Sequence, residues 1–460
     1  MYVRPDRWRS VVAVIFFTFS VGAGPCFAQK DPPLSLKDSI DLALKQSVLA
    51  HAASEGVRGA EAQRKEALTS FFPKLSTTYN YTRLNEAPTF TFPSIPIFSP
   101  GPPPIAIKTP SFTVDAGTQD NYTWTLEARQ PLFAGGAIVA NYQLSKLGEA
   151  IARWDETATV QDIIQEVRVS YFYILKAGRI LEVARQSLEQ LKAHRDTAQN
   201  FYDVGMIPKN DLLYAEVQLA NGEQFLVRAE NGLELANSRF NTVLRRGIDT
   251  PVVVEDILIY QPFEKTLEAC LAIALERRPE LKSYALKVEQ ARNGVRLARS
   301  EYFPSLSMVG NYSRFGDEPD LGGTPYKNEE SWYIMAVANW NFWEWGRTKN
   351  RVDFSRTREA QAADLLTNIR DQVILEIKNA YLLLREAEKQ VLVSKRAIDQ
   401  AEENFRINQE RYREQVATST DVIDAQTLLT KAKSDYYNAL GDYHISQAKL
   451  ERAMGFTELR

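Results

Sequence analysis

One uninterrupted stretch decides the fold of this chain: residues 137–202, which read AIVANYQLSKLGEAIARWDETATVQDIIQEVRVSYFYILKAGRILEVARQSLEQLKAHRDTAQNFY. It contains no proline, and its apolar or small residues recur at steps of three and four. These positions are Val160, Ile164, Val167, Tyr171, Ile174, Gly178, Leu181, Leu188 and Leu191. Steps that average about 3.5 residues are typical of a coiled-coil seam. At about 1.5 Å per residue, the stretch predicts a helical rod of roughly 100 Å, too long for a compact core.

The rod occurs twice, because the chain is an internal repeat. Residues 35–83 align without gaps to residues 266–314 at an offset of 231, and further along the offset becomes 210. The second rod has its own seam: Ile374, Ile377, Tyr381, Leu384, Ala387, Val391, Ile398, Ala401 and Phe405. We divide the chain into a first repeat, a linker, a second repeat and a tail, at 29–250, 251–265, 266–456 and 457–460. Each repeat is expected to run helix, strand, loop, strand, long helix, tight turn and return helix.

The change of offset places a 21-residue insertion in the first repeat. It lies between Glu86 and Thr118, and the segment 87–117 is crowded with prolines. These are Pro88, Pro93, Pro96, Pro100, Pro102, Pro103, Pro104 and Pro110. Because proline has no backbone N–H to donate, we expect an exposed, extended loop. The sequence does not identify a role for it.

Two segments in each repeat alternate in the manner of a strand with one apolar face. Each is about 10 to 12 residues long, enough to cross a bilayer when tilted. Tryptophans at the end of the last segment suit the aromatic girdle of a transmembrane barrel. The side chains that we expect to face the membrane are Tyr122, Trp124, Leu126, Trp332, Ile334, Trp340 and Phe342. An ordinary soluble sheet is the alternative that the pattern alone leaves open.

The N-terminus indicates export. Three arginines precede an apolar run at 11–23, which ends in the small-residue pattern Cys26-Phe27-Ala28. We therefore predict a signal peptide over residues 1–28. Pro25 argues against lipidation of Cys26, which intact mass would test. No later stretch reaches the roughly 18 apolar residues of a transmembrane helix.

Composition argues against several functional classes. The formal net charge of −3 gives no basic surface for nucleic acid. Cys270 lies in an apolar helical pattern and is expected to be buried. The isolated histidines His51, His194 and His444 lack metal-ligand spacing, and no phosphate loop or nucleophile elbow is present. We expect a protein that is not an enzyme and has no cofactor or metal.

The number of strands requires assembly. Two strands per repeat make four per chain, whereas a membrane barrel needs at least about eight and tolerates no open edge in lipid. A symmetric ring would give one tube, β in the membrane and α beyond it. Three copies would supply twelve strands.

In combination these features resemble the TolC-like outer-membrane efflux family. The resemblance rests on the repeat, on Phe-Pro junctions at 72–73 and 303–304, on Leu-Phe-Ala-Gly-Gly at 132–136, and on a turn motif. That motif is Tyr-x-x-Gly, five residues, then Asp-(Leu/Val)-x-x-Ala. The resemblance covers nearly all of residues 35–455. The resemblance implies a mainly α fold, in which a homotrimer forms a long α-helical barrel of coiled-coil hairpins and a twelve-stranded transmembrane β-barrel.

The function that the resemblance implies is an export channel in the outer membrane of a Gram-negative cell, with a long periplasmic extension. Such a channel contacts outer-membrane lipid and docks a periplasmic adaptor protein bound to an inner-membrane efflux pump. It conducts substrates passively, and the pump supplies the energy. Two alternatives stay open: the channel of type I protein secretion, and a non-conducting structural coiled-coil protein of the periplasm. The cargo and the pump class are not determined.

The resemblance also implies roles at the tip of the helical part. Asp421 and Asp424 match a periplasmic constriction, although carboxylates there also favour a helix N-terminus. Asp211 and Tyr412 match positions that hold the tip helices together. The expected adaptor contact is Val204, Gly205 and Met206. The second turn departs from the family pattern: Gln415 replaces a glycine, which puts adaptor recognition there in question, and Ala417 replaces a basic residue.

Overall fold

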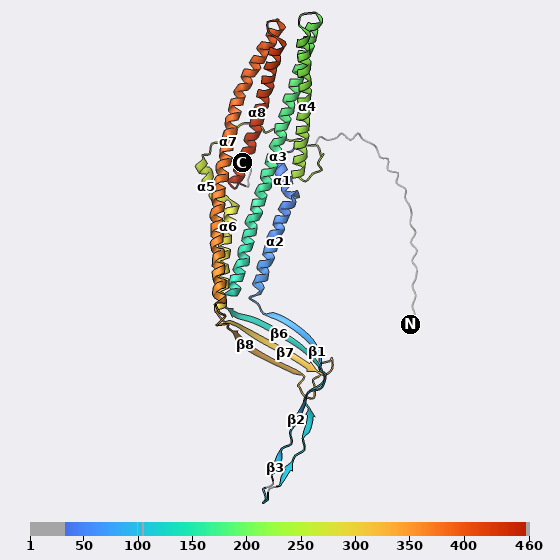
Figure 1. Cartoon of the computed structure of the whole chain (residues 1–460), viewed down its shortest axis with the longest axis vertical. Helices are drawn as coiled ribbons and strands as arrows, with labels where there is room; N and C mark the ends of the chain where they lie inside the picture. The colour runs from blue at the N-terminus through green and yellow to red at the C-terminus, as the bar shows by residue number, and fades with distance from the viewer. Residues whose placement is uncertain (1–32, 99, 104, 457–460) are drawn as a thin grey trace, which may run out of the picture.

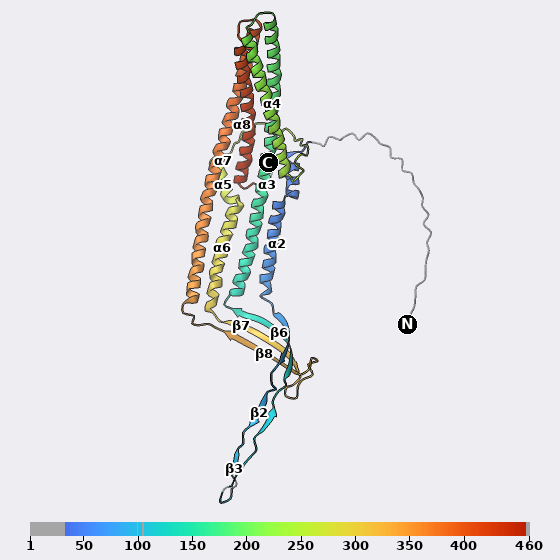
Figure 2. The ribbon, with the colours of Figure 1, turned by 45° about the vertical axis from the view of Figure 1, so that its right-hand side comes forward.

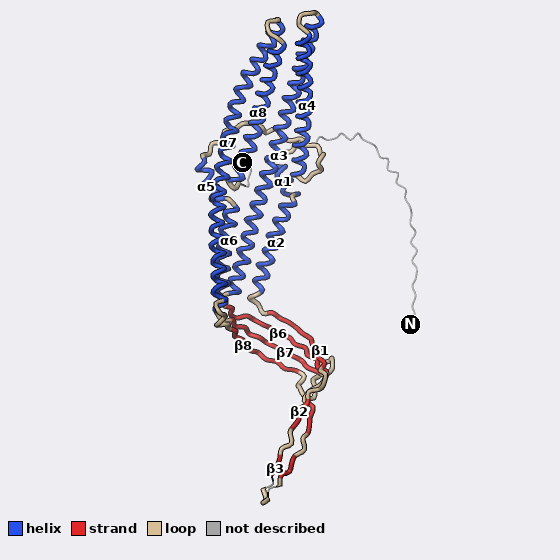
Figure 3. The backbone as a smooth tube through the Cα atoms, in the orientation of Figure 1, coloured by secondary structure: helices blue, strands red, loops and turns tan. Residues whose placement is uncertain are grey.

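The computed structural model describes residues 33–98, 100–103 and 105–456 of the chain. The molecule is elongated: helices fill one end, a small sheet follows, and a narrow ribbon extends from the far end of the sheet (Figure 1, Figure 2). Figure 3 shows that helices and strands occupy separate lengths of the molecule. The predicted signal peptide 1–28, with Cys26, and the tail 457–460 lie outside the described residues.

Two long helices run through the helical part. α3 spans Ala137–Asp203 and α7 spans Arg347–Arg413, each with 67 residues. Each is therefore about 100 Å long, and the rod predicted over 137–202 is confirmed. Return helices α4 (Lys209–Val243) and α8 (Ser419–Ala453) lie against them toward the tip (Figure 1).

A tight turn precedes each long helix. Gly136 and Gly346 take φ of 89° and 81°, and the residues before them, Gly135 and Trp345, take 61° and 52°. A side chain at Gly135 would overlap the carbonyl oxygen of Ser300, so only glycine fits there. The tryptophan at the matching position of the second repeat is held in the same left-handed region, with its side chain almost fully exposed.

The helix predicted before each Phe-Pro junction is in fact two helices. They are α1 (Leu36–Gln46) and α2 (Val48–Thr69) in the first repeat, and α5 (Leu267–Arg277) and α6 (Pro279–Arg299) in the second. Ser47 is extended and its hydroxyl accepts from Ala50 N, which starts a new helix. In the second repeat, Pro279 keeps Arg278 out of the α region. α2 and α6 pack beside α3, and α6 also packs on α7.

The sheet joins the two repeats. Its strands are β1 (Lys74–Arg83), β6 (Asp120–Ala134), β7 (Ser305–Gly316) and β8 (Glu330–Asn339). They lie in the order β1-β6-β7-β8, and all neighbours are antiparallel. The four predicted extended segments are therefore strands of one sheet, with β6 of the first repeat paired to β7 of the second.

The proline-rich insertion is more regular than predicted. Its strands are β2 (Thr89–Phe92), β3 (Pro96–Phe98), β4 (Ala106–Lys108) and β5 (Phe112–Asp115). β2 pairs with β5, and β3 pairs with β4, so the expected loop is a two-stranded ribbon. The prolines flank the short ladders or begin one, as Pro96 does, and this leaves enough N–H groups for pairing.

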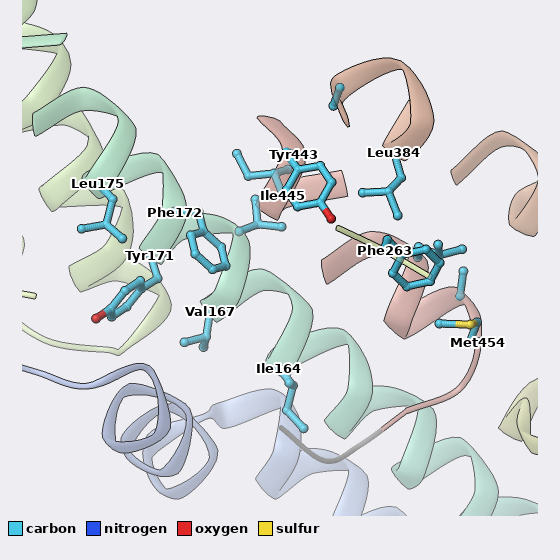
Figure 4. Packing of buried hydrophobic residues seen from close by; sticks show 14 of the residues in the cluster. Ile164, Val167, Tyr171, Phe172, Leu175, Phe263, Leu384, Tyr443, Ile445 and Met454 are labelled. Atoms are coloured by element: carbon cyan, nitrogen blue, oxygen red, sulfur yellow. The ribbon is translucent and has the colours of Figure 1, made fainter. Parts of the chain in front are cut away.

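The main hydrophobic core lies midway along the helical part, where α1 and α5 meet the long helices. Figure 4 shows Phe172 of α3 directed toward Ile445 and Tyr443 of α8, with Leu384 of α7 beside Tyr443, while Tyr171 points away from Leu384. The linker 251–265 closes this core from outside, with Leu258 and Phe263 buried in it. Cys270 is buried there, as expected. Among the helices in the described part of the chain, none is both long and apolar enough to span a membrane.

Candidate functional site

The tip of the helical part consists of two similar turns. After α3, Gly205 N donates to Tyr202 O at 2.8 Å and Met206 N donates to Phe201 O at 2.8 Å. After α7, Gln415 N and Val416 N donate to the Tyr412 and Arg411 carbonyls at 3.0 and 2.8 Å. This pair of backbone hydrogen bonds is typical of a helix C-terminus that ends at a residue in the left-handed conformation. Both turns therefore have the same backbone, although their sequences differ.

Gln415 takes the place of glycine without changing the turn. Its φ is 62°, against 77° at Gly205, so a residue with a Cβ occupies the left-handed region. Its side-chain amide donates to the Met206 sulfur at 3.5 Å, which links the two turns. The missing glycine thus leaves the backbone shape of the second turn intact.

Replacing Gln415 with glycine is expected to stabilise the second hairpin. A left-handed conformation costs a residue with a Cβ about 1 kcal/mol more than glycine. We therefore expect Gln415→Gly to raise the free energy of tip opening by about that amount, measured by amide hydrogen exchange of the turn. Gly205→Ala is the matched reverse variant and should speed exchange at the first turn. Equal exchange rates in the parent and in both variants would contradict this account.

The two candidate constriction carboxylates differ in their surroundings. Asp421 accepts from Thr418 N and from the Thr418 hydroxyl, both at 2.8 Å, while Asp421 N donates to that hydroxyl at 3.2 Å. These bonds form a capping box at the start of α8. They lower the pKa of Asp421, with the Thr418 backbone N–H as the main cause. Asp424 lies one turn further on the same exposed face and has no hydrogen-bond or ion-pair partner among the described residues.

Tyr412 is packed into the tip through contacts of its ring. Its ring lies 5.0 Å from His194 and 5.5 Å from Phe201, and its side chain is almost fully buried. Within the described chain, no hydrogen bond joins its hydroxyl to Asp211. Burial, and then the nearby Asp211 carboxylate, raise the pKa of Tyr412.

His194 was not singled out by the sequence as a tip residue. It lies on α3, and its Nε2 is 2.8 Å from the hydroxyl of Ser419, the first residue of α8. It therefore links the two hairpins next to Tyr412. Burial lowers the pKa of His194 to about 4. No local pattern marks this role, because it depends on a contact across 225 residues.

Mild acid is expected to weaken the protein through two partly buried histidines, His194 and His444. Burial also lowers the pKa of His444, to about 4, where its ring stacks on Phe172 at 4.7 Å. An unfolded histidine titrates near 6.5, so the unfolded state binds more protons between about pH 6.5 and 4. The free energy of unfolding should therefore decrease as the pH is lowered through that window, by up to about 1.4 kcal/mol per pH unit for each histidine.

The measurement is the urea midpoint of the purified protein between pH 7 and 5, a range above most carboxylate titrations. His194→Gln keeps a hydrogen-bonding group for Ser419 but cannot titrate, so its midpoint should depend less on pH. His51, which is exposed on α2, is the matched control, and His51→Gln should follow the parent. An unchanged pH dependence in His194→Gln would contradict the assignment.

The predicted adaptor contact lies at the end of the molecule and is accessible. Val204 and Met206 have exposed side chains on either side of Gly205, and Val416 of the second turn is exposed as well. The tip therefore presents apolar side chains on two turns that Gln415 links. Such a surface suits a protein partner.

The register of the sheet places the apolar sides of all four strands on one face. Tyr79 pairs with Trp124, Leu126 with Tyr312, and Tyr312 with Trp332. Partners across a ladder share a face. This face carries Leu75, Tyr79, Tyr81, Tyr122, Trp124, Leu126, Leu306, Met308, Tyr312, Trp332, Ile334 and Ala336. Most of these large side chains are exposed, which is unusual for one contiguous surface.

The opposite face of the sheet is mainly polar. It carries Thr78, Asn80, Thr123, Thr125, Glu127, Arg129, Asn311 and Ser313. Thr125 and Ser313 hydrogen-bond at 3.2 Å, and Glu127 pairs with Arg129 at 3.0 Å. Apolar side chains interrupt this face at Val309 and Phe315 of β7 and at Tyr333, Met335 and Val337 of β8. The outer edges of β1 and β8 have no strand partner in the described chain.

Two of the residues expected on a membrane strand lie beyond it. β8 ends at Asn339, so Trp340 and Phe342 belong to the connection to α7, and their assignment to the strand is wrong. The ladder stops because β7 begins directly after Pro304, which has no N–H to extend it. The indole of Trp340 instead donates to Tyr302 O at 3.2 Å. Trp340, Phe342, Trp343 and Trp345 form an exposed aromatic group at this end of the sheet.

The chain is similar to known proteins over most of its length. The family model described as "Outer membrane efflux protein" matches residues 39–244 and 271–456. The chain is 21% identical over 305 residues to Outer membrane protein TolC of Escherichia coli (strain K12), which covers 64% of this chain and 62% of that protein. It is 24% identical over 311 residues to the protein of that name from Vibrio cholerae, covering 65% of this chain and 68% of that one. The match thus leaves more than a third of the E. coli relative uncovered.

Solved structures resemble the fold more completely. The Campylobacter jejuni CmeC outer membrane channel superposes with a TM-score of 0.76, at 19% identity, over 91% of this chain and 85% of that one. VceC, an outer membrane protein of Vibrio cholerae, gives a TM-score of 0.76 at 16% identity, over 91% and 96%. At these identities the likeness concerns the arrangement of helices and strands.

Proposed function

Because this chain belongs to the outer membrane efflux protein family, we propose that three copies form the exit duct of a tripartite efflux system. The duct passively conducts substrates that an inner-membrane pump delivers through a periplasmic adaptor. The family is one of channels, not of enzymes. The proposed location is the outer membrane, with the helical part extending into the periplasm.

The observation that carries this proposal is the sheet. It has one apolar face, one mainly polar face and two unpaired edges, β1 and β8. A lone sheet of this kind is unsuited to lipid, because its edges leave backbone groups without partners. Pairing β8 of each copy with β1 of the next closes twelve strands, which turns the apolar face to lipid and the polar face to a lumen. A structural coiled-coil rod would need no such sheet.

The helical part supports the same reading. α3 and α7 run its full length, while α2 and α6 near the sheet and α4 and α8 near the tip complete four helical lines. Three copies would arrange twelve lines around one axis, continuous with the barrel. Val204, Met206 and Val416 at the exposed tip are the proposed adaptor contact.

At the tip, Asp421 and Asp424 are proposed to line the constriction of the trimer. Their spacing of three places both on the exposed face of α8, so a trimer would hold six carboxylates around one axis. Since Asp421 also caps α8, its replacement by alanine would change structure and charge together. Asparagine keeps an acceptor for Thr418 N and removes the charge.

We expect the double variant Asp421→Asn and Asp424→Asn to lower the cation-to-anion permeability ratio by several-fold in planar bilayers. Charged rings in a narrow aperture select by charge, and this variant removes them. Asp435→Asn, about four turns along α8, is the matched control and should conduct like the parent. Purified trimers that do not conduct would refute the channel itself, and unchanged selectivity in the double variant would refute the constriction.

A further inference from the structure

The ribbon formed by residues 87–117 has no core of its own. Nearly all of its side chains are exposed, and its large apolar residues are 42–64% exposed. These are Phe90, Phe92, Ile95, Ile97, Phe98, Ile105, Ile107, Phe112 and Val114. An isolated two-stranded ribbon is marginally stable in water, and an apolar surface of this extent marks an interaction site.

The apolar side chains gather on one face of the β2–β5 ladder. Phe90 pairs with Val114 and Phe92 pairs with Phe112, with the two Phe rings of the second pair stacked at 4.7 Å. The other face carries Thr91 and Thr113, whose hydroxyls hydrogen-bond at 2.9 Å. The ribbon therefore has one polar face and one apolar face that is unfavourably exposed to water.

Lipid is a poor candidate to cover this face. The strands of the sheet have 10 to 15 residues, which already suffices to cross the hydrocarbon layer, so the ribbon begins beyond it. In Figure 1 and Figure 2 the ribbon continues along the long axis of the molecule and stays within the width of the sheet and helices. A segment lying on the membrane surface would instead run across that axis.

The charge and the proline content of the ribbon favour equivalent ribbons of other copies as the partners that cover its apolar face. Lys108 and Asp115 are the only charged residues in the sequence of the ribbon, 87–117, so each copy carries no net charge there and symmetric copies meet with little repulsion. Prolines along both strands interrupt the N–H groups at the ribbon edges, which disfavours edge-to-edge pairing. Contact through the apolar side-chain face remains.

We propose that the ribbons of three copies pack together through this face, centred on Phe92, and narrow the outer mouth of the channel. The inference rests on the trimeric channel proposed above. The root of each ribbon lies between β1 and β6, next to the edge where neighbouring copies would pair. Three-fold symmetry then arranges the three ribbons around one axis. The contact would give the exit a hydrophobic constriction at the opposite end from the carboxylates of the tip.

The test is disulfide formation between copies of the full-length channel in a Cys270→Ser background. Under mild oxidation, Phe92→Cys should give several-fold more disulfide-linked dimer than Thr91→Cys, which lies one residue away on the opposite face. Ile97→Cys is a second probe nearer the ribbon end. Replacing residues 88–116 with Gly-Gly should raise the single-channel conductance several-fold, because the outer constriction is lost.

The outcomes separate this inference from the function. A conducting trimer in which Phe92→Cys and Thr91→Cys both fail to link, or link equally, overturns the ribbon contact and leaves the channel standing. Lipid vesicles that shield Phe92→Cys from a water-soluble maleimide, without cross-links, would assign the face to lipid and overturn the inference as well. Absence of any trimer would refute both.

Discussion

Ile334→Arg is expected to abolish assembly of the protein in the outer membrane. Ile334 lies in the middle of β8, opposite Gly310, on the apolar face and with an exposed side chain. Arginine at the middle of the lipid-facing surface of a barrel costs about 2–4 kcal/mol. Three copies bear this cost together, on the order of 6–12 kcal/mol, which is comparable with the whole stability of many proteins.

The neighbouring position provides a matched control. Tyr333 is on the same strand, but its side chain projects from the opposite face, next to Asn311. Tyr333→Arg adds the same charge toward the proposed lumen and should leave normal amounts of trimer in the outer-membrane fraction. The measurement is the amount of trimer there by immunoblot. If Ile334→Arg assembles as well as Tyr333→Arg, the apolar face does not face lipid.

Tyr171→Ala is expected to be the most damaging single truncation in the helical part. Tyr171 is fully buried in the main core, and its ring packs edge-on against Phe240 at 6.1 Å. Its hydroxyl donates to Glu255 O at 2.8 Å, and Leu34 O also lies within hydrogen-bond distance of it at 3.1 Å. These bonds fasten the start of the first repeat and the linker 251–265 to α3. Removing a buried aromatic ring costs about 3–5 kcal/mol.

The free energy of unfolding, from urea titration followed by circular dichroism, is the quantity to compare. Tyr171→Phe keeps the ring and removes only the hydroxyl, so it should cost about 1–3 kcal/mol. Leu235→Ala on α4 is the control for an exposed side chain and should change stability by less than about 0.5 kcal/mol. A Tyr171→Ala protein as stable as Leu235→Ala would show that the linker is held by other contacts.

The long helices could be predicted because their signals are local and repeated. The absence of proline and the seam residues of 137–202 fix a helix wherever the chain lies, and α3 follows them to within a residue. Strand alternation around Trp124 and Ile334 is equally local. The helix breaks at Ser47 and Arg278 have local signals, a capping serine and a following proline. The helical periodicity continues across both breaks, so the periodicity alone predicts one continuous helix.

The tip could be located from the sequence, but its contacts could not. The motif places Asp421 at a helix start, and only the structure shows that Thr418 engages its carboxylate while Asp424 is left without a partner among the described residues. His194 and Ser419 meet across 225 residues, and no sequence pattern records such a pair. Gln415 shows the converse, because the backbone bonds of the turn hold it in a conformation that its side chain disfavours.

By itself, the sequence determined the repeat, the two rods and the four strands, and from the number of strands it predicted assembly of more than one copy. Those features depend on the spacing of residues that are near one another in the chain. The tertiary structure decided which strand faces align, where β8 ends, that the proline-rich insertion is a paired ribbon, and which tip groups meet. Each of these depends on register and packing between distant segments, where a shift of one residue turns every side chain to the opposite face.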